Sequence, residues 1–214
     1  MNTEVFRAWI VSAAAVIEAN RDHLTQLDAA IGDADHGINL ARGFTAVTAA
    51  LEAADGTAAS RPATPGAVLT LTGSTLISKV GGASGPLYGV AFRRAGKALG
   101  TAATVDLPAL GEALEAALAG VQQLGAAREG DKTMVDALAP ATRAFGKAIA
   151  DGAPAAEAVS ALAEAAAAGA AATVSMQARK GRASYLGPRS VGHEDPGAAS
   201  TALILAALRD VVAR

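Results

Sequence analysis

The segment Leu27-Asp-Ala-Ala-Ile-Gly-Asp-Ala-Asp-His-Gly37 separates two stretches of helical sequence. Before it, apolar residues recur every three or four positions from Phe6 to Leu27, and the same spacing resumes after it from Leu40 to Leu51. Such spacing indicates helices with one apolar face. The polar, glycine-containing segment between them is therefore expected to be a loop that joins two helices.

Helical spacing continues along the rest of the chain, and several helix starts carry capping signals. Thr64-Pro65 and Asp195-Pro196 each place an N-cap residue before a proline at the first helical position, and Asp106 is a further N-cap. The stretch 56–65 is too short to divide the chain into domains. We expect an all-α, single-domain, eight-helix up-and-down bundle or barrel over residues 1–214, with helices near 6–27, 40–51, 65–80, 86–99, 107–124, 131–149, 154–177 and 196–211.

Composition is compatible with this fold and excludes several classes of function. Hydrophobic residues make up 51% of the chain and aromatic residues only 3%, so small side chains must fill the core and let helices approach closely. The net charge of −2 provides no bulk attraction to nucleic acid or anionic lipid. The lack of cysteine excludes disulfides and thiol chemistry. Residues 1–6 lack a signal-peptide layout, and no uninterrupted apolar run approaches the ~20 residues that span a bilayer. We expect a cytoplasmic protein.

The unusual polar and glycine-rich residues collect in four loops, at 28–39, 81–86, 125–133 and 179–197. These are the first, third, fifth and seventh connections between the predicted helices. In an up-and-down bundle, every second connection lies at the same end. The four loops are therefore expected to form one site at one end of the bundle.

The first loop carries three carboxylates, Asp28, Asp33 and Asp35, within eight residues. Carboxylates this close repel one another unless a cation compensates their charge. Ligands that offer only oxygen favour a hard ion such as Mg²⁺ or Ca²⁺. The first loop therefore predicts a metal site.

Two simpler interpretations of this loop are weaker. Asp33 or Asp35 could cap the following helix, which is a common role for aspartate but explains only one of the three carboxylates. An EF-hand is excluded because Ile38 stands where its glycine is needed and Phe44 stands where its bidentate glutamate is needed. His36 is expected to be a hydrogen-bonding loop residue rather than a metal ligand.

The second loop, Gly-Gly-Ala-Ser-Gly-Pro at 81–86, places free backbone N–H groups before a helix. A helix N-terminus of this kind binds phosphate through its N–H groups and its dipole. Glycine-rich helix breaks are also common as simple turns, so the phosphate interpretation depends on the acidic loop at the same end.

The third loop resembles a P-loop but departs from it. Asp131 stands between the second glycine and Lys132, and no strand precedes the loop, so we reject a Walker A motif. Two interpretations stay open: Asp131 caps the next helix while Lys132 is solvated, or either residue contacts phosphate. Gly125 and Met134 could leave room for a nucleobase and pack on it.

The fourth loop carries four cations, Arg179, Lys180, Arg182 and Arg189. Such a run is commonly a solvated surface, yet at the same end as the carboxylates one arginine could bind phosphate. The loop is long for a compact domain, which is typical of a binding segment or a lid.

Five motifs follow one another along the chain. They are Ile31-Gly-Asp-Ala-Asp-His-Gly37, Gly81-Gly-Ala-Ser-Gly-Pro86, Gly130-Asp-Lys-Thr-Met134, Met176-Gln-Ala-Arg-Lys-Gly-Arg-Ala-Ser-Tyr-Leu-Gly187 and Gly192-His-Glu-Asp-Pro-Gly197. Together, and in this order, they resemble the motifs of a known family, the nucleotide-binding L subunit of dihydroxyacetone kinase.

The resemblance implies an eight-helix barrel that binds ADP or ATP at one end. It assigns two Mg²⁺ ions to Asp28, Asp33 and Asp35, and it gives Arg182 a catalytic role against the terminal phosphates. By motif position, it implies nucleotide contacts from His36, Gly37, Ile38, Asn39, Ala83, Ser84, Gly125, Met134, Arg182, Asp195, Pro196 and Gly197.

The resemblance also implies that this chain is inactive alone. In the family, dihydroxyacetone is held covalently on a histidine of a separate K subunit. The standalone length is similar to the phosphotransferase-system type, in which bound ADP is rephosphorylated by an M subunit. Alternatives stay open: an ATP-dependent subunit for another ketose such as erythrulose, an ADP-state sensor that docks on a transcription regulator, or a helical cation-binding protein. A homodimer is also left open.

Overall fold

The computed structural model describes residues 1–56 and 61–214, with only the backbone of Asp55 described; residues 57–60 of the expected linker lie outside the described part. The described residues form nine α-helices and two 3₁₀ helices. One isolated bridge pairs Asn2 with Thr104. The elements are α1 (Thr3–Ala19), α2 (Arg21–Ile31), α3 (His36–Asp55), α4 (Pro65–Lys79), α5 (Ser84–Leu99), α6 (Leu107–Gly125), α7 (Val135–Ala150), α8 (Ala155–Ala172), η1 (Thr173–Ser175), η2 (Arg182–Ser190) and α9 (Pro196–Val212).

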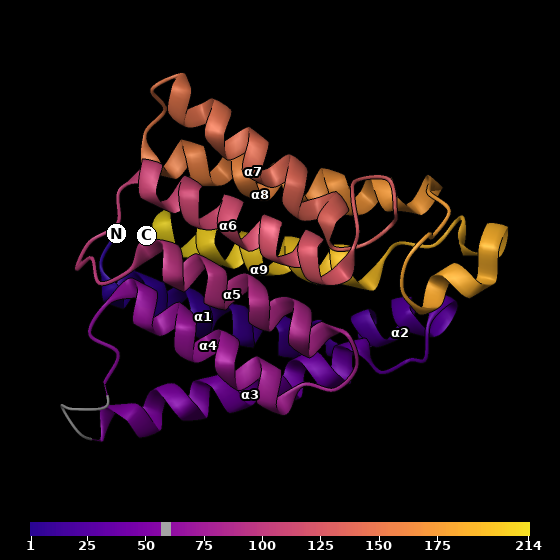
Figure 1. Ribbon diagram of the computed structural model, residues 1–214, viewed down its shortest axis with the longest axis horizontal. Helices are drawn as coiled ribbons and strands as arrows, with labels where there is room; N and C mark the ends of the chain where they lie inside the picture. Colours follow the sequence, from indigo (N-terminus) through magenta and orange to yellow (C-terminus); the bar gives the residue numbers. More distant parts are fainter. Residues whose placement is uncertain (57–60) are drawn as a thin grey trace.

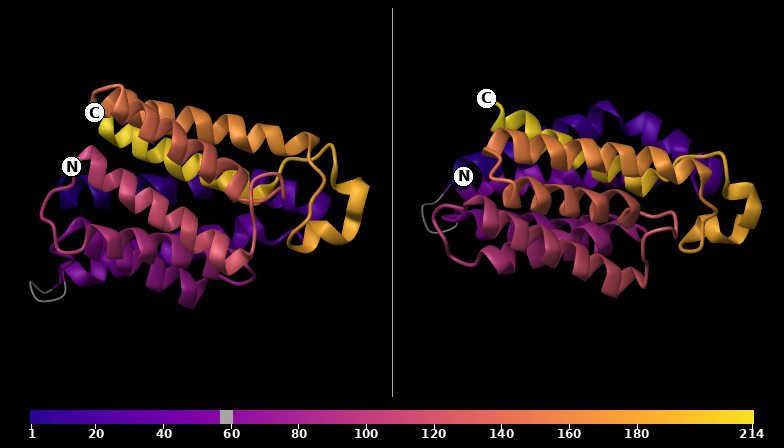
Figure 2. Two further views of the ribbon diagram at one scale, coloured as in Figure 1. Left: turned by 45° about the horizontal axis from the view of Figure 1, so that its top comes forward. Right: turned by 90° about the horizontal axis from the view of Figure 1, so that it is seen from above.

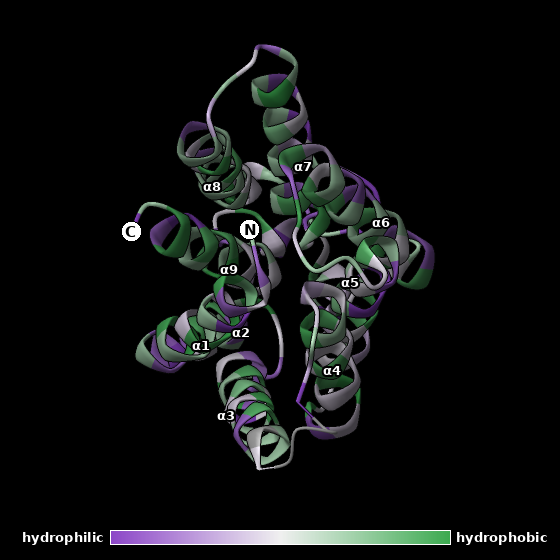
Figure 3. Cartoon of the chain, turned by 90° about the vertical axis from the view of Figure 1, so that its left-hand side faces the viewer, coloured by the Kyte–Doolittle hydropathy of each residue, from purple (hydrophilic) through white to green (hydrophobic). Residues whose placement is uncertain are grey.

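Eight of these helices form a closed ring. Each of α3 to α9 contacts the next along the chain, α1 contacts α3, and α1 packs against α9 to close the barrel. Figure 3 views this ring along its axis. Apolar side chains from all eight helices are buried inside it. The prediction of an all-α, eight-helix barrel is confirmed.

The predicted single helix over residues 6–27 is wrong at Asn20. The chain there leaves helical geometry (φ −106°, ψ 11°), and the Asn20 side-chain amide donates to the Val16 carbonyl at 2.8 Å. Asparagine commonly competes for the backbone in this way. The break produces α2 as a separate helix, which contacts α3, α9 and η2 rather than completing the ring.

The predicted caps at three helix starts are confirmed. The side chains of Thr64, Asp106 and Asp195 accept hydrogen bonds from backbone N–H groups three residues later, at 3.2, 2.9 and 2.7 Å. Each cap is followed within two residues by a proline inside the helix. These local signals fix where α4, α6 and α9 begin.

Several predicted boundaries differ in the structure. The loop expected at 28–39 is shorter, because α2 continues to Ile31 and so contains Asp28, and α3, expected near 40–51, runs over His36–Asp55. The helix expected from near Asp131 begins at Val135, because Gly130 and Lys132 have φ of +89° and +60°, which a right-handed helix does not allow. The stretch expected to be irregular after residue 179 contains the 3₁₀ helix η2, interrupted by non-helical geometry at Gly187.

The core follows from the composition. Four of its aromatic rings form one chain of contacts, with centroids 6.0 Å apart for Phe6 and Trp9, 5.9 Å for Trp9 and Phe92, and 6.4 Å for Phe44 and Phe92. Alanine, leucine and valine fill most of the remaining interior. Close approach of α4 and α5 requires glycine, because a Cβ on Gly66 would lie 2.7 Å from the carbonyl oxygen of Gly96 and closer still to that of Gly100.

One helical stretch passes a length and composition test for a membrane span. Ala155–Ser175 is apolar enough as a whole, although Glu157 and Glu164 interrupt it. In the barrel, 44% of the tested window is buried, and α8 packs against α7 and α9. This packing is that of a helix in a bundle.

The two ends of the barrel differ in what they carry. The N- and C-termini lie together at one end, as Figure 1 shows, and α2 and η2 lie at the other. The two further views in Figure 2 agree, with η2 projecting beyond the helices. All four polar loops line one cavity at the end opposite the termini. The prediction that alternate connections converge is confirmed.

Candidate functional site

A cavity of about 280 Å³ opens at this end of the barrel. Every one of the four loops contributes to its wall, and so do α5 and α6. The lining residues include Asp28, Gly32, Asp33, Asp35, His36, Gly82, Ala83, Ser84, Leu87, Val121, Gly125, Lys132, Met134, Lys180, Arg182, Asp195, Pro196 and Gly197.

The acidic loop brings its three carboxylates together. Asp28, Asp33 and Asp35 each offer an oxygen, and these atoms all lie within 4.8 Å of one another. Asp28 is the buried member, at the end of α2, and its Oδ2 accepts from the N–H groups of Asp35 at 2.8 Å and His36 at 3.1 Å. The N-terminus of α3 thereby fixes the orientation of the Asp28 carboxylate.

A simple capping role for this loop does not explain its geometry. Among the described residues, Asp35 precedes α3 without making a side-chain cap, and Asp28 supplies the carboxylate instead. The turn between them needs a strained residue, because Ala34 has a φ of +61°. It also needs Gly32, since a Cβ there would overlap the Asp28 carboxylate.

The donor set fits a hard divalent cation. Three carboxylate groups within 4.8 Å concentrate negative charge, and only oxygen is offered. Arg182 pairs with one of them, since its Nη2 lies 3.1 Å from Asp33 Oδ2. One exposed guanidinium does not balance three carboxylates, so the loop can accept Mg²⁺.

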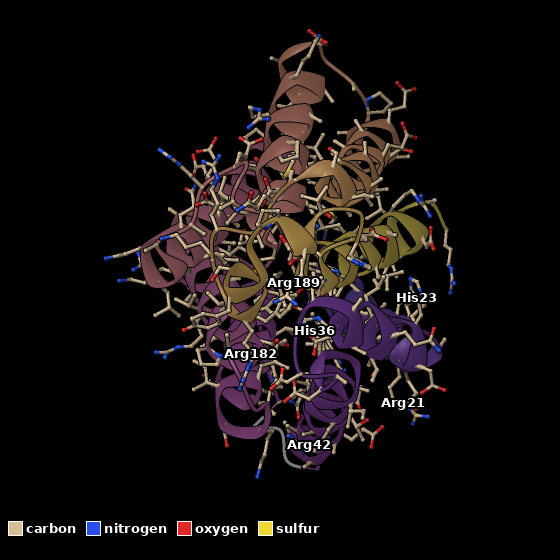
Figure 4. The ribbon with its side chains drawn as sticks, turned by 90° about the vertical axis from the view of Figure 1, so that its right-hand side faces the viewer. Arg21, His23, His36, Arg42, Arg182 and Arg189 are labelled. Atoms are coloured by element: carbon tan, nitrogen blue, oxygen red, sulfur yellow. The ribbon has the colours of Figure 1, made fainter. Side chains whose placement is uncertain are left out.

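Arg182 reaches the cavity from η2, and its side chain is 70% exposed. An exposed ion pair contributes only about 0–1 kcal/mol, so the guanidinium can exchange Asp33 for another anion at little cost. Figure 4 looks onto this end, with Arg182, Arg189 and His36 labelled; Arg182 and His36 line the cavity, and both arginines belong to η2.

The N-terminus of α5 faces the same cavity. Gly82, Ala83 and Ser84 line the wall, and Gly82 adopts a φ of +67° that favours glycine. In the described structure, the first turn of α5 has no side-chain cap. Its N–H groups are therefore available to an anionic ligand.

A buried polar network joins three helices beneath the cavity. His36 Nδ1 lies 3.0 Å from Ser84 Oγ, and His36 Nε2 lies 2.9 Å from Ser200 Oγ. Tyr88 extends the network, with its hydroxyl 2.7 Å from Ser200 Oγ and 2.9 Å from Thr201 Oγ1. Burial lowers the pKa of His36 and raises that of Tyr88, so both side chains are held neutral.

The opposite wall is apolar. Leu87 and Val121 face the cavity beside Gly125, and Met134 is buried at its edge. A Cβ on Gly125 would lie 3.4 Å from Leu87 Cδ2, so a side chain there would narrow the opening. This wall therefore offers an apolar surface to a ligand in the cavity.

Asp195 completes the floor at the start of α9. It caps that helix through the Ala198 N–H at 2.7 Å and is buried. Burial raises its pKa to about 7; the carboxylate of Asp136 adds to this increase, and Lys132 opposes it. A carboxyl group at the cavity floor therefore titrates near neutral pH.

Comparison with known proteins decides the family. The DAK2 domain matches residues 30–210. The chain belongs to the DAK2 domain family. It is 42% identical to the PEP-dependent dihydroxyacetone kinase, ADP-binding subunit DhaL, of Escherichia coli K12, over 92% of this chain and 91% of that subunit. It is 38% identical to the PTS-dependent counterpart of Lactococcus lactis, over 96% and 95% of the two chains.

Longer proteins contain the same domain. The L-erythrulose 1-kinase of Mycolicibacterium smegmatis is 37% identical over 91% of this chain, which spans 33% of that kinase. The solved structure of the C. freundii dihydroxyacetone kinase in complex with AMP-PNP and Mg²⁺ matches with a TM-score of 0.70 and 28% identity, covering 98% of this chain and 34% of that one.

Not every expected contact lies in the cavity of this DAK2 domain. Within the described residues, the lining leaves out Gly37, Ile38 and Asn39. Gly37 packs against the backbone of α2, Ile38 is exposed, and the Asn39 side chain accepts from Arg42 at 2.8 Å. Their role as nucleotide contacts stays a prediction.

The structure contradicts the interpretation of the third loop in which Asp131 caps the next helix and Lys132 is solvated. Lys132 is not solvated: it is 1% exposed, and its Nζ donates to carbonyl oxygens. Asp131 does not cap α7, because its Oδ2 accepts from the Arg128 N–H at 3.0 Å. Asp136, inside α7, accepts instead from the N–H groups of the preceding turn.

Proposed function

We propose that this chain is the ADP-binding subunit of a dihydroxyacetone kinase, with residues 1–214 forming one nucleotide-binding domain. The observation that carries the proposal is the placement of three carboxylates, an uncapped helix N-terminus and an exposed arginine around one cavity. Relatives of nearly the same length that carry this name support it.

Each wall of the cavity suits one part of a magnesium–nucleotide complex. Asp28, Asp33 and Asp35 would hold the metal as two Mg²⁺ ions, which supply charge neutralisation and orient phosphate oxygens. The first turn of α5 would bind phosphate, and the apolar wall would take the base. The proposed nucleotide contacts are His36, Gly37, Ile38, Asn39, Ala83, Ser84, Gly125, Met134, Arg182, Asp195, Pro196 and Gly197.

The chain's own residues would stabilise charge rather than move protons. Arg182 would release Asp33 for a phosphate oxygen, because charge-assisted hydrogen bonds to phosphate exceed an exposed ion pair. His36 stays neutral through burial and holds the Ser84 hydroxyl at the α5 N-terminus. No general base is needed here, because the hydroxyl that accepts the phosphoryl group lies on the substrate held by the partner.

The proposed partners are a K subunit that holds dihydroxyacetone and an M subunit that rephosphorylates bound ADP in the cytoplasm. Relatives that match over more than nine-tenths of their length are named PEP-dependent or PTS-dependent, and this favours a phosphoprotein as the donor.

A second candidate is an ATP-dependent subunit for erythrulose. L- and D-erythrulose kinases match at 37% and 36% identity. Those kinases are about three times longer than the matched region, since this chain spans 33% and 35% of them. The full-length relatives therefore favour dihydroxyacetone.

Reconstitution tests both candidates. The purified chain is assayed for co-purifying ADP and then mixed with a K subunit, a ketose, and either ATP or the phosphotransferase components with phosphoenolpyruvate. We expect bound ADP and phosphorylated dihydroxyacetone only with the phosphotransferase donor. Product only from erythrulose and ATP would support the second candidate. Bound ADP without product from either donor would contradict both and indicate a nucleotide sensor.

A further inference from the structure

The basic loop over the cavity has a closed base. We call residues 177–189 the arginine loop, and residues 173–176 and 190–193 its neck. The two sides of the neck lie together, because the Gly192 N–H donates to the Val174 carbonyl at 2.7 Å. The Ala178 N–H donates to Ser190 Oγ at 2.9 Å where the loop opens. The arginine loop therefore leaves and rejoins the barrel at one point.

Lys132 inserts into this neck from a different part of the chain, the turn before α7. Its Nζ donates to the carbonyls of Thr173 at 2.9 Å and Met176 at 3.2 Å on the outgoing side. On the returning side it donates to Ser190 at 2.7 Å and to His193. An ammonium has three N–H groups, so four carbonyl oxygens saturate it.

The surroundings of Lys132 are unusual for a lysine. It is 1% exposed, and all four described hydrogen-bond partners are backbone carbonyls rather than carboxylates. Lysine is almost never buried this far without a paired acid. Burial lowers the pKa of Lys132, and the nearby negative charge of Asp195 acts in the opposite direction.

The backbone conformation of Lys132 indicates that its side chain is needed at this position. Lys132 has a φ of +60°, a conformation in which glycine would be less strained. The neighbouring Asp131 joins the same contact, since its carbonyl accepts from the Arg179 N–H at 3.0 Å. A strained lysine is thus used where the turn touches both sides of the neck.

We propose that Lys132 is a positioning residue: its ammonium acts as a built-in cation that locks the neck of the arginine loop. The lock holds two residues of the proposed nucleotide site. Arg182 lies on the loop, and Asp195 follows the returning side of the neck, where its N–H donates to Thr173 Oγ1 at 2.9 Å. The consequence for nucleotide binding rests on the proposed function, whereas the lock itself does not.

The competing role for Lys132 is direct contact with phosphate, because the residue also lines the cavity. To reach phosphate, the ammonium would have to leave four carbonyls without their donor, two of them in fully buried contacts. Buried acceptors that lose a partner carry a large desolvation cost. The geometry therefore favours the lock.

The absence of cysteine from the sequence allows a direct test. Lys132→Cys creates a unique thiol. The thiol is alkylated in the unfolded chain, and the chain is then refolded. Bromoethylamine restores an ammonium at nearly the lysine length, whereas 1-bromopropane gives a neutral side chain of the same length. Lys147→Cys, at an exposed lysine, is treated identically as the matched control.

Digestion with an arginine-specific protease, without nucleotide, reports the state of the loop. The loop offers Arg179, Arg182 and Arg189 as cleavage sites. With the neutral side chain we expect roughly ten- to hundredfold faster cleavage there than with the ammonium, corresponding to the loss of charged hydrogen bonds. We expect the affinity for Mg–ADP to fall when the side chain at position 132 is the neutral propyl derivative, and to return when it is the charged aminoethyl derivative.

Other outcomes separate the two ideas. Equal protection of the loop with neutral and charged side chains overturns the lock. Full protection with the neutral side chain but loss of Mg–ADP binding also overturns it and supports phosphate contact. If ammonium-dependent protection is seen while the unaltered chain does not bind Mg–ADP, the lock stands and the proposed function fails. Should refolding fail, Lys132→Gly, purified without denaturant, gives the same digestion test, and a protected loop in that variant overturns the lock.

Discussion

Lys132 and Arg182 line the same cavity and carry the same charge, yet their surroundings differ in almost every respect. Lys132 is 1% exposed and donates to four backbone carbonyls. The Arg182 side chain is 70% exposed and pairs with one carboxylate, that of Asp33. The first is saturated by the fold, and the second keeps donors free.

This difference assigns the two cations opposite roles. A buried cation that loses its partners is costly, so Lys132 stays where the fold holds it. An exposed ion pair is worth little, so Arg182 can change partners when an anionic ligand arrives. The two residues share a positive charge and a place in the cavity wall, so neither property separates their roles. The number and kind of their hydrogen-bond partners do.

The largest effect is expected at the exposed cation, Arg182, when its carboxylate partner is removed. Asp33→Ala deletes one of the three clustered carboxylates, and we expect phosphoryl transfer with the partner subunits to fall about a thousandfold or more. The folded chain should remain, because Asp33 is on the surface. Steady-state kinetics and thermal unfolding measure the two effects. Asp210→Ala, which breaks an exposed pair with Arg209, is the control and should leave transfer unchanged.

Replacing Arg182 itself tests whether the guanidinium acts in the transition state. We expect Arg182→Met to lower kcat about a hundredfold with a smaller change in KM. Arg182→Lys should recover little of this, because an ammonium lacks the planar fork that binds phosphate oxygens in pairs. Arg209→Met is the matched exposed variant. Normal kcat in Arg182→Lys would mean that charge alone is sufficient.

The surroundings of the buried cation, Lys132, can be tested through the pH dependence of stability, because Lys132 acts electrostatically on Asp195. Its folded-state pKa of about 7 exceeds the ordinary value of 3.8, so the folded chain keeps a proton that the unfolded chain loses. The contribution of Asp195 to stability is fully present below about pH 4 and is lost as pH rises through about 7. Each unit of pKa difference corresponds to about 1.4 kcal/mol.

Asp195→Asn, which retains an N-cap side chain, should therefore flatten the fall in unfolding free energy between about pH 4 and pH 7. Urea denaturation at several pH values measures it. Asp106→Asn makes the same substitution at another helix cap, at an exposed site, and is the matched control for the loss of a capping carboxylate. An unaltered profile in Asp195→Asn would mean that the carboxyl group is ionised in the folded chain.

Local signals are the reason that much of the fold could be predicted. Apolar spacing identifies each helix, and caps such as Thr64 and Asp106 act within one turn of their partners. Alternation of helix direction then places every second loop at one end without any knowledge of long-range contacts. The acidic loop could be found for the same reason, since its carboxylates lie within eight residues of sequence.

The details that could not be predicted depend on partners far along the chain. Lys132 meets the carbonyl of His193, 61 positions away, and His36 meets Ser200, 164 positions away. A sequence motif shows a lysine or a histidine without showing which buried group will face it. The break at Asn20 is subtler, because asparagine within a helical pattern either continues the helix or ends it, and packing decides.

The smallest effects are expected in the free energy of unfolding when each of the two cations is replaced by methionine. Lys132→Met should lower the free energy of unfolding by about 1–3 kcal/mol, because four buried or part-buried carbonyls lose a charged donor. Arg182→Met should change it by less than about 1 kcal/mol, as expected for an exposed ion pair. Urea denaturation at constant pH, with Lys147→Met as the exposed-lysine control, measures both. Equal losses for Lys132→Met and Arg182→Met would remove the distinction between a cation held by the fold and one reserved for a ligand.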